Sequence, residues 1–230
     1  MHRPSDNGAG YELKVLAFAD FHGNNSAVKG ASDLVSIEHP DLVVVAGDLA
    51  NHDLKKAELI LRELSRSGSK VLFVPGNMDA PALAERQDTH NVTCLHGKAV
   101  VHGEVCFIGL GGATESQFGA PLEFSEREAA KILSRAAEAC SSHSLIVVSH
   151  CPPKDTRLDL AGGRSHVGSQ FVREFIEEKK PILAICGHIH EAQGTDSIGH
   201  CLIVNVGATA HGHYASICLT RPLRIELRRL

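Results

Sequence analysis

The chain has 230 residues and a formal net charge of -4, and its acidic and basic residues are mixed without a basic block. It has no Trp and only 2 Tyr, so we expect neither a base-stacking surface nor stable nucleic-acid binding. No apolar run approaches the ~18 residues of a membrane-spanning helix, so no membrane partner is expected. The 7 Cys are widely spaced and include no Cys-x-x-Cys, which favours a reduced, cytoplasmic protein without a disulfide framework.

Residues 1–12 lack the apolar core of a signal peptide and are predicted to form a flexible tail, followed by one domain over 13–230. The first half of that domain alternates apolar runs with amphipathic stretches. Strands are predicted at 13–19, 42–46 and 70–74, and helices from Asn24 or Asn25 to His39 and from Leu54 to Gly68. This β-α-β-α-β order favours a parallel sheet with right-handed crossovers.

The second half of the domain begins with short strands that no helices separate. Residues 92–109 predict short strands in antiparallel hairpins, broken at His96-Gly97 and Gly103-Glu104. A capping box of Ser125 and Glu128 opens a helix that runs to about Cys140. Buried strands follow at 145–149 and 182–186, separated by a polar loop over 151–166 and a helix over 169–179, and three short strands start at Cys201.

Polar side chains directly follow five of these strands. They are Asp20-x-His22, Gly47-Asp48, Gly76-Asn77-Met78-Asp79, Ser149-His150 and Gly187-His188-x-His190. Each motif alone is also an ordinary turn or surface sequence. Because sites in such sheets form beyond the carboxyl ends of the strands, we expect the five loops to converge. Carboxylate, imidazole and amide ligands without thiolate suit Mn, Fe, Zn, Ni or Mg, and Asp48 is the natural bridge between two such cations.

This ordered set resembles the calcineurin-like metallophosphoesterase superfamily, from residue 13 to nearly the end of the chain. The resemblance implies an α/β fold, a four-layer α/β/β/α sandwich with mixed sheets and a dinuclear metal site at the carboxyl ends of the strands. Asp20, His22, Asp48 and His190 would hold one metal, Asp48, Asn77, His150 and His188 the other, and Asp79 would orient a ligand. Residues 112–119 and 164–169 are similar to small prokaryotic phosphoesterases related to cyclic-nucleotide phosphodiesterases.

The expected reaction is hydrolysis of a P–O bond by a hydroxide that bridges two divalent metals, with manganese favoured and a phosphate-ester small molecule or nucleotide as substrate. Met78 stands where the superfamily usually carries a His that protonates the leaving oxygen, so efficient monoester hydrolysis is not expected. His166 is the preferred replacement acid, with His211 and His213 as alternatives. Asp48, Asn77 and His166 are thus the predicted catalytic residues, although each of the three replacement histidines also fits an exposed loop.

Two other functions fit the same residues. A non-catalytic interaction scaffold on this fold is compatible with Met78 but leaves the full ligand set unexplained. A DNA-processing nuclease is disfavoured by the acidic balance and the lack of aromatic residues. A homo-oligomer could form through edge strands near 92–109 or 214–229.

Overall fold

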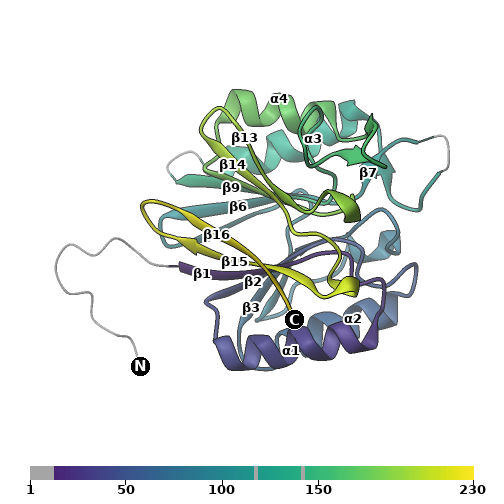
Figure 1. The fold of residues 1–230 in the computed structure, drawn as a ribbon, viewed down its shortest axis with the longest axis vertical. Coiled ribbons are helices and arrows are strands. Elements are labelled where there is room, and N and C mark those ends of the chain that lie inside the picture. The colour runs from purple at the N-terminus through teal and green to yellow at the C-terminus, as the bar shows by residue number, and fades with distance from the viewer. Residues whose placement is uncertain (1–12, 117–118, 141–142) are drawn as a thin grey trace.

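The computed structural model describes residues 13–116, 119–140 and 143–230, so the tail predicted over 1–12 lies outside the described residues. Two six-stranded sheets pack face to face, and two long helices cover the outer face of each sheet (Figure 1). This arrangement confirms the four-layer α/β/β/α sandwich that the resemblance implies.

The first sheet has the strand order β16-β15-β1-β2-β3-β4. Its parallel strands are β1 (Leu13–Phe18), β2 (Leu42–Ala46), β3 (Lys70–Val74) and β4 (Val92–Cys94). The late strands β15 (His213–Leu219) and β16 (Arg224–Arg229) extend it in antiparallel pairing beside β1. Helices α1 (Asn25–Glu38) and α2 (Leu54–Leu64) bury their apolar sides against its outer face.

The second sheet has the order β13-β14-β12-β9-β6-β5. Its parallel strands are β6 (Val105–Leu110), β9 (Ser144–Ser149), β12 (Leu183–Cys186) and β14 (Cys201–Asn205), with β5 (Ala99–His102) and β13 (Gly194–Ile198) antiparallel at the edges. Helices α3 (Glu126–Ala137) and α4 (Gln170–Lys179) cover its outer face. Two small pairs, β7 (Ala113–Thr114) with β8 (Glu123–Phe124) and β10 (Leu160–Ala161) with β11 (Ser165–His166), lie in the connecting loops.

Local signals explain where the helices begin. The Asn24 side chain accepts hydrogen bonds from two backbone amides at the start of α1, and Ser125 and Glu128 form the complete capping box of α3. His39 ends α1 in the left-handed region at φ 44°, directly before Pro40. Between the sheets, alternate strand residues such as Val44 and Phe107 form a continuous apolar core. The two sheets therefore pack against each other through one shared apolar core.

Two expectations from the sequence are wrong. β5 and β6 form the expected antiparallel hairpin around Gly103-Glu104, but residues 92–94 instead add β4 in parallel to β3, where the Leu95 amide bonds to Phe73 and the Val71 amide to Asn91. Cys106 and Cys140 are joined by a disulfide with 5.7 Å between their Cα atoms, although no disulfide was expected. The pairing arises because α3 crosses β6 and is followed by the 3₁₀ turn Glu138–Cys140, which returns the second cysteine to that strand.

Among the described residues, no helix is both long and apolar enough to cross a membrane. The cytoplasmic location, the single domain and a homo-oligomer remain predictions.

Candidate metal centre

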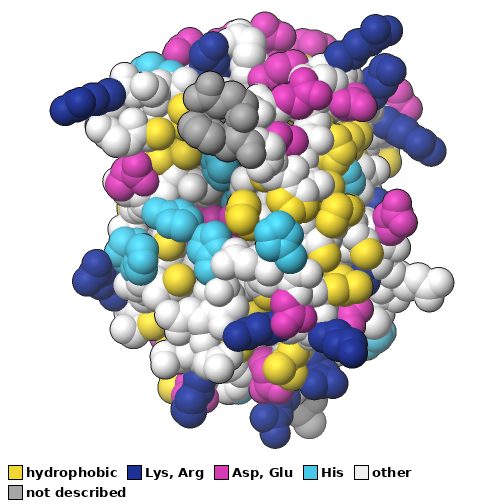
Figure 2. Space-filling view, turned by 90° about the vertical axis from the view of Figure 1, so that its right-hand side faces the viewer, with side chains coloured by type: hydrophobic (Ala, Val, Ile, Leu, Met, Phe, Trp, Pro, Cys, Tyr) yellow, Lys and Arg dark blue, Asp and Glu magenta, His cyan; other side chains and the backbone are white. Residues whose placement is uncertain are grey.

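Loops from both sheets meet at the carboxyl ends of β1, β2, β3, β9 and β12. The Asp20 amide donates to the Gly47 carbonyl at 2.9 Å, and the His22 amide donates to the Asp48 carbonyl at 2.9 Å. The Asp20 carboxylate reaches the second sheet, where it accepts from the His188 amide at 3.0 Å. Figure 2 looks onto this end of the molecule and shows histidine side chains gathered around a small hollow. The structure thus brings the predicted loops together.

The first group of converging side chains is Asp20, His22 and His190, whose potential ligand atoms all lie within 4.8 Å of one another. The Nε2 atoms of the two histidines are 3.1 Å apart, and His190 Nε2 is 3.6 Å from Asp20 Oδ1. Asp20 is fully buried, and its Oδ1 atom has no hydrogen-bond partner among the described residues. A buried carboxylate oxygen without a partner is costly, and a bound cation would satisfy it.

The second group is Asp20, Asp48 and His150, again within 4.8 Å of one another. Two further predicted ligands adjoin it: Asn77 Oδ1 lies 2.9 Å from His150 Nε2, and the rings of His150 and His188 are 4.9 Å apart. All seven predicted metal ligands therefore lie in or directly beside these two groups.

Asp20 belongs to both groups, and Asp48, a member of the second group, also faces the first. The Oδ2 atom of Asp48 is 3.8 Å from His22 Nε2, and its Oδ1 atom is 3.7 Å from His150 Nε2. Each carboxylate oxygen thus faces a histidine of a different group. This is the placement that a carboxylate needs to bridge two cations.

Hydrogen bonds turn the free lone pairs of two histidines toward the hollow. His150 Nδ1 donates to the Ala46 carbonyl at 2.8 Å, so in the neutral ring Nε2 offers a lone pair. That lone pair faces the amide oxygen of Asn77, which is also an acceptor. His22 Nδ1 likewise donates to Asn51 Oδ1 at 2.7 Å, which leaves its Nε2 facing the first group. Lone pairs that point at each other repel unless a proton or a cation lies among them, so this donor set fits divalent metals.

The backbone around these side chains is strained. Asp20, His22, Asp48 and His188 have positive φ values of 54°, 46°, 51° and 71°, which L-residues other than Gly rarely adopt. Such strain persists only where the surrounding structure enforces it, and it is concentrated at functional sites.

Three glycines let the loops approach closely enough. A Cβ atom on Gly47 would lie 2.2 Å from His150 Nδ1, one on Gly76 would lie 2.0 Å from Asp48 Oδ1, and one on Gly187 would lie 2.6 Å from Asp20 Oδ2. Side chains at these positions would displace the ligand atoms.

Burial and mutual charge shift the pKa values within the groups. Burial raises the pKa of Asp48, and the charge of Asp20 adds to this. Burial opposes ionisation of Asp20 as well, but the neighbouring His190 and His150 hold its pKa below the ordinary value. Burial beside His150 lowers the pKa of His188 to about 3, so this ring is neutral and can act as a ligand at pH 7.

Two residues position the predicted ligands from outside the two groups, and the sequence predicted only one of them. Asp79, predicted to orient a ligand, is buried and accepts from the amides of Leu49, Ala50 and Gly76 at 2.9–3.0 Å, so it shapes the loop beside Asp48. Asn51 was not predicted. It stands three residues after Asp48, and only the left-handed turn at φ 32° directs it to His22.

The predicted acids lie in different surroundings. His166 projects from β11 into a separate polar cavity of about 410 Å³, and its Nδ1 atom is 2.7 Å from Asp159 Oδ1. His211 lies against the ligands, with its ring 6.0 Å from that of His190. His213 Nε2 faces the Arg229 guanidinium at 3.0 Å. The backbone amide of Met78 donates to Asp48 Oδ1 at 2.8 Å, so this residue supports the site through its main chain.

Known proteins are similar to this chain in sequence and in fold. The Methanocaldococcus jannaschii protein MJ1162 is 32% identical over 200 residues, covering 84% of this chain and 87% of its own. The fold is similar to the crystal structure of TT1561 from Thermus thermophilus, with a TM-score of 0.77, 20% identity and coverage of 95% and 99% of the two chains. It is also similar to an archaeal phosphodiesterase, with a TM-score of 0.57, 14% identity and coverage of 95% and 100%.

The family model for metallophosphoesterases of the calcineurin superfamily matches residues 50–230, which is more than half of the chain. Asp20, His22 and Asp48 precede the matched range, but the fold places them against the histidines within it. The chain therefore belongs to the calcineurin superfamily of metallophosphoesterases.

Proposed function

We propose that this protein is a phosphodiesterase that depends on two divalent cations. The observation that carries the proposal is the position of Asp48, whose two carboxylate oxygens face histidines of the two ligand groups. Asp20, His22, Asp48 and His190 would hold one cation. Asp48, Asn77, His150 and His188 would hold the other.

Carboxylate, imidazole and amide oxygen ligands without thiolate suit borderline to hard ions such as Mn, Fe, Zn, Ni and Mg, and manganese is the metal that we propose among them. When bound, the pair of cations would make water nucleophilic at neutral pH and neutralise the charge of the phosphate oxygens. The chain's own residues hold the site ready for this chemistry. Ala46 fixes the tautomer of His150, Asn51 fixes that of His22, and Asp79 holds the loop that carries Asp48.

Met78 argues against efficient hydrolysis of monoesters. A thioether cannot give a proton to the leaving oxygen, and this loss is most severe for poor alkoxide leaving groups. The structural similarity to an archaeal phosphodiesterase agrees with the choice of a diester, although at 14% identity it extends to the fold alone. The substrate class that we propose is a small phosphodiester, including a cyclic nucleotide.

The proton donor is a second part of the proposal. His166 was preferred from the sequence, whereas His211 is the histidine that contacts His190. We expect His211→Ala to reduce turnover of an alkyl-leaving-group diester by about 10²-fold or more, and that of a nitrophenyl diester much less. His166→Ala should then affect both substrates equally; the opposite pattern would return the role to His166.

A metal add-back experiment tests the function. The protein is stripped with a chelator, and each divalent ion is returned in turn before hydrolysis of bis(p-nitrophenyl) phosphate and p-nitrophenyl phosphate is measured. We expect manganese to restore activity at two equivalents, with the diester preferred. Asp48→Asn should abolish activity, while the exposed His90→Ala serves as the matched control. Preference for the monoester, or equal activity of Asp48→Asn, would refute the proposal.

The alternative is a metal-binding scaffold without catalytic activity, which Met78 favours. This alternative predicts two bound cations per chain in calorimetry but no turnover of either substrate with any of the five metals. The same experiment therefore separates the two functions.

A further inference from the structure

Another cavity lies at the opposite end of the molecule from the metal centre. It has a volume of about 750 Å³, within the range of small-molecule sites. Its floor includes Ser144, the first residue of β9, whereas His150 directly follows the last residue of that strand. The six residues of β9 span roughly 20 Å, so the two sites are separated by the length of the sheet.

The cavity is built from both sheets. Its floor is formed where neighbouring strands of the second sheet begin, and backbone bonds tie these starts together: Ser144 donates to Glu104 at 3.0 Å, and Leu202 donates to Ile182 at 3.3 Å. Its roof is the turn between β15 and β16, where Thr220 Oγ1 donates to the Pro222 carbonyl at 2.7 Å. Because hydrogen bonds hold both the floor and the roof in place, the cavity is formed without a ligand.

Most of the lining is apolar. Ile182 and Leu202, each 37% exposed, are two of the few large apolar side chains at the described surface, and both face this cavity. Leu219 and Leu223 enclose the space from the first sheet. Exposed apolar side chains that gather at one concave place mark binding sites rather than random surface.

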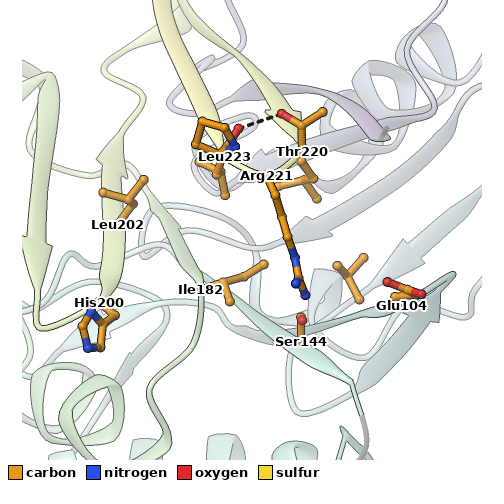
Figure 3. A pocket seen from close by; sticks show the side chains of 11 residues that line it. Glu104, Ser144, Ile182, His200, Leu202, Thr220, Arg221 and Leu223 are labelled. Carbon is orange, nitrogen blue, oxygen red and sulfur yellow. Dashed lines mark hydrogen bonds between the residues drawn. The ribbon is translucent and has the colours of Figure 1, made fainter. Parts of the chain in front are cut away.

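One cation enters this apolar space. Figure 3 shows the Arg221 side chain extending from the roof toward Ser144 on the floor. Among the residues that the structure describes, the Arg221 guanidinium has no hydrogen bond and no ion pair. Guanidinium groups bind carboxylates through two parallel hydrogen bonds, and the Ser144 hydroxyl is a further donor in the same lining. Glu104 is the one acid of the lining, and its charge would oppose an anion.

We propose that this cavity binds a small aliphatic carboxylate, with its acid group on Arg221 and its chain against Ile182, Leu202 and Leu223. A phosphate or sulfate would fit the apolar walls poorly, and an amine would be repelled by the guanidinium. The proposal is independent of the metal centre and of the function proposed for it.

Calorimetry with sodium butanoate, hexanoate and octanoate tests the site, in the presence and in the absence of manganese. Affinity should rise by up to about fourfold for each added methylene and should not depend on manganese. Arg221→Gln should weaken octanoate binding about tenfold or more, because a charge-assisted hydrogen bond is lost. Glu104→Gln should strengthen it, and Arg62→Gln, which changes an exposed arginine on α2, should leave it unchanged.

Several results would overturn the proposal. They are no octanoate binding at millimolar concentration, equal binding by Arg221→Gln, binding only with manganese, or tighter binding of octylamine than of octanoate. Arg221 is exposed, so its replacement should not prevent folding, and an unchanged thermal midpoint confirms this. Leu202→Trp, which fills the cavity from the floor, should abolish binding independently of charge.

Discussion

Asn51 offers a sharp test of how the metal centre is organised. Its amide oxygen accepts from His22 Nδ1 at 2.7 Å. Because an amide oxygen can only accept, Nδ1 carries the proton and Nε2 presents its lone pair to Asp20 and His190. Removing this acceptor frees the ring to rotate and to adopt the other tautomer. We therefore predict weaker binding of one of the two cations.

The expected loss of metal affinity follows from the surroundings of the His22–Asn51 hydrogen bond. Loss of an outer-shell partner typically costs 10- to 100-fold in metal affinity. The His22–Asn51 hydrogen bond is solvent-exposed, so water can partly replace the acceptor. We therefore expect the lower end of the range, about tenfold or ~1.4 kcal/mol. The second cation, on the side of His150 and Asn77, should bind almost as before.

The choice of variant matters because Asn51 has a φ of 32°. Alanine at this angle would add a backbone strain of roughly 1 kcal/mol, whereas glycine would not. Asn51→Gly thus removes the acceptor alone, Asn51→Ala adds strain, and Asn51→Asp keeps an acceptor oxygen. Manganese binding to each variant is measured by calorimetry with a competing chelator. Wild-type affinity in Asn51→Gly, or equal weakening of both sites, would refute the reasoning.

Three further predictions concern the same loops. Burial raises the pKa of Asp48, so the ionised carboxylate destabilises the folded metal-free protein as the pH rises above the unfolded-state pKa. Asp48→Asn should therefore raise the urea midpoint of the metal-free protein at pH 7. The same variant should lose the stabilisation that manganese gives to the wild type. Burial lowers the pKa of His188 to about 3, so between pH 6.5 and 3 this histidine takes up a proton in the unfolded chain but not in the folded one, and the folded state loses stability as the pH falls. In metal-free His188→Gln, stability against urea should fall less steeply than in the wild type over the same pH range. Gly76→Ala places a Cβ atom 2.0 Å from Asp48 Oδ1, so it should lower the free energy of unfolding by denaturant by about 1–3 kcal/mol and should also weaken manganese binding. The control is Gly30→Ala within α1, whose Cβ atom has its nearest contact at 3.4 Å and should leave stability unchanged or raise it.

The sequence was sufficient for the elements whose signals are local. The run Leu42–Ala46 is apolar throughout because both of its faces are buried, and the Ser125–Glu128 box marks the start of α3 directly. The rule that polar loops converge beyond the carboxyl ends of strands then placed residues as distant in sequence as Asp20 and His190 in one group.

The parts that the sequence could not predict depend on partners far along the chain. β4 has three residues, too few for periodicity to reveal, and its parallel pairing depends on where the preceding loop returns to β3. The Cys106–Cys140 pair depends on how α3 crosses β6. The short strands β10 and β11 lie in a segment read as a loop, and two-residue strands carry no pattern of their own.

The metal centre also gives a physical reason why the strained loops persist. Asp20 and Asp48, two of the residues that would hold the cations, are buried carboxylates at left-handed φ angles. This arrangement opposes folding through the desolvation of the carboxylates and through backbone strain. Nothing in the apolar core requires it, since other residues at these positions could end the strands without strain. The arrangement becomes favourable when cations bind, because ligands that are already oriented lose little further entropy. The same features that weaken the metal-free fold would therefore strengthen cation binding, so the stability of this protein should depend on the cations that we propose.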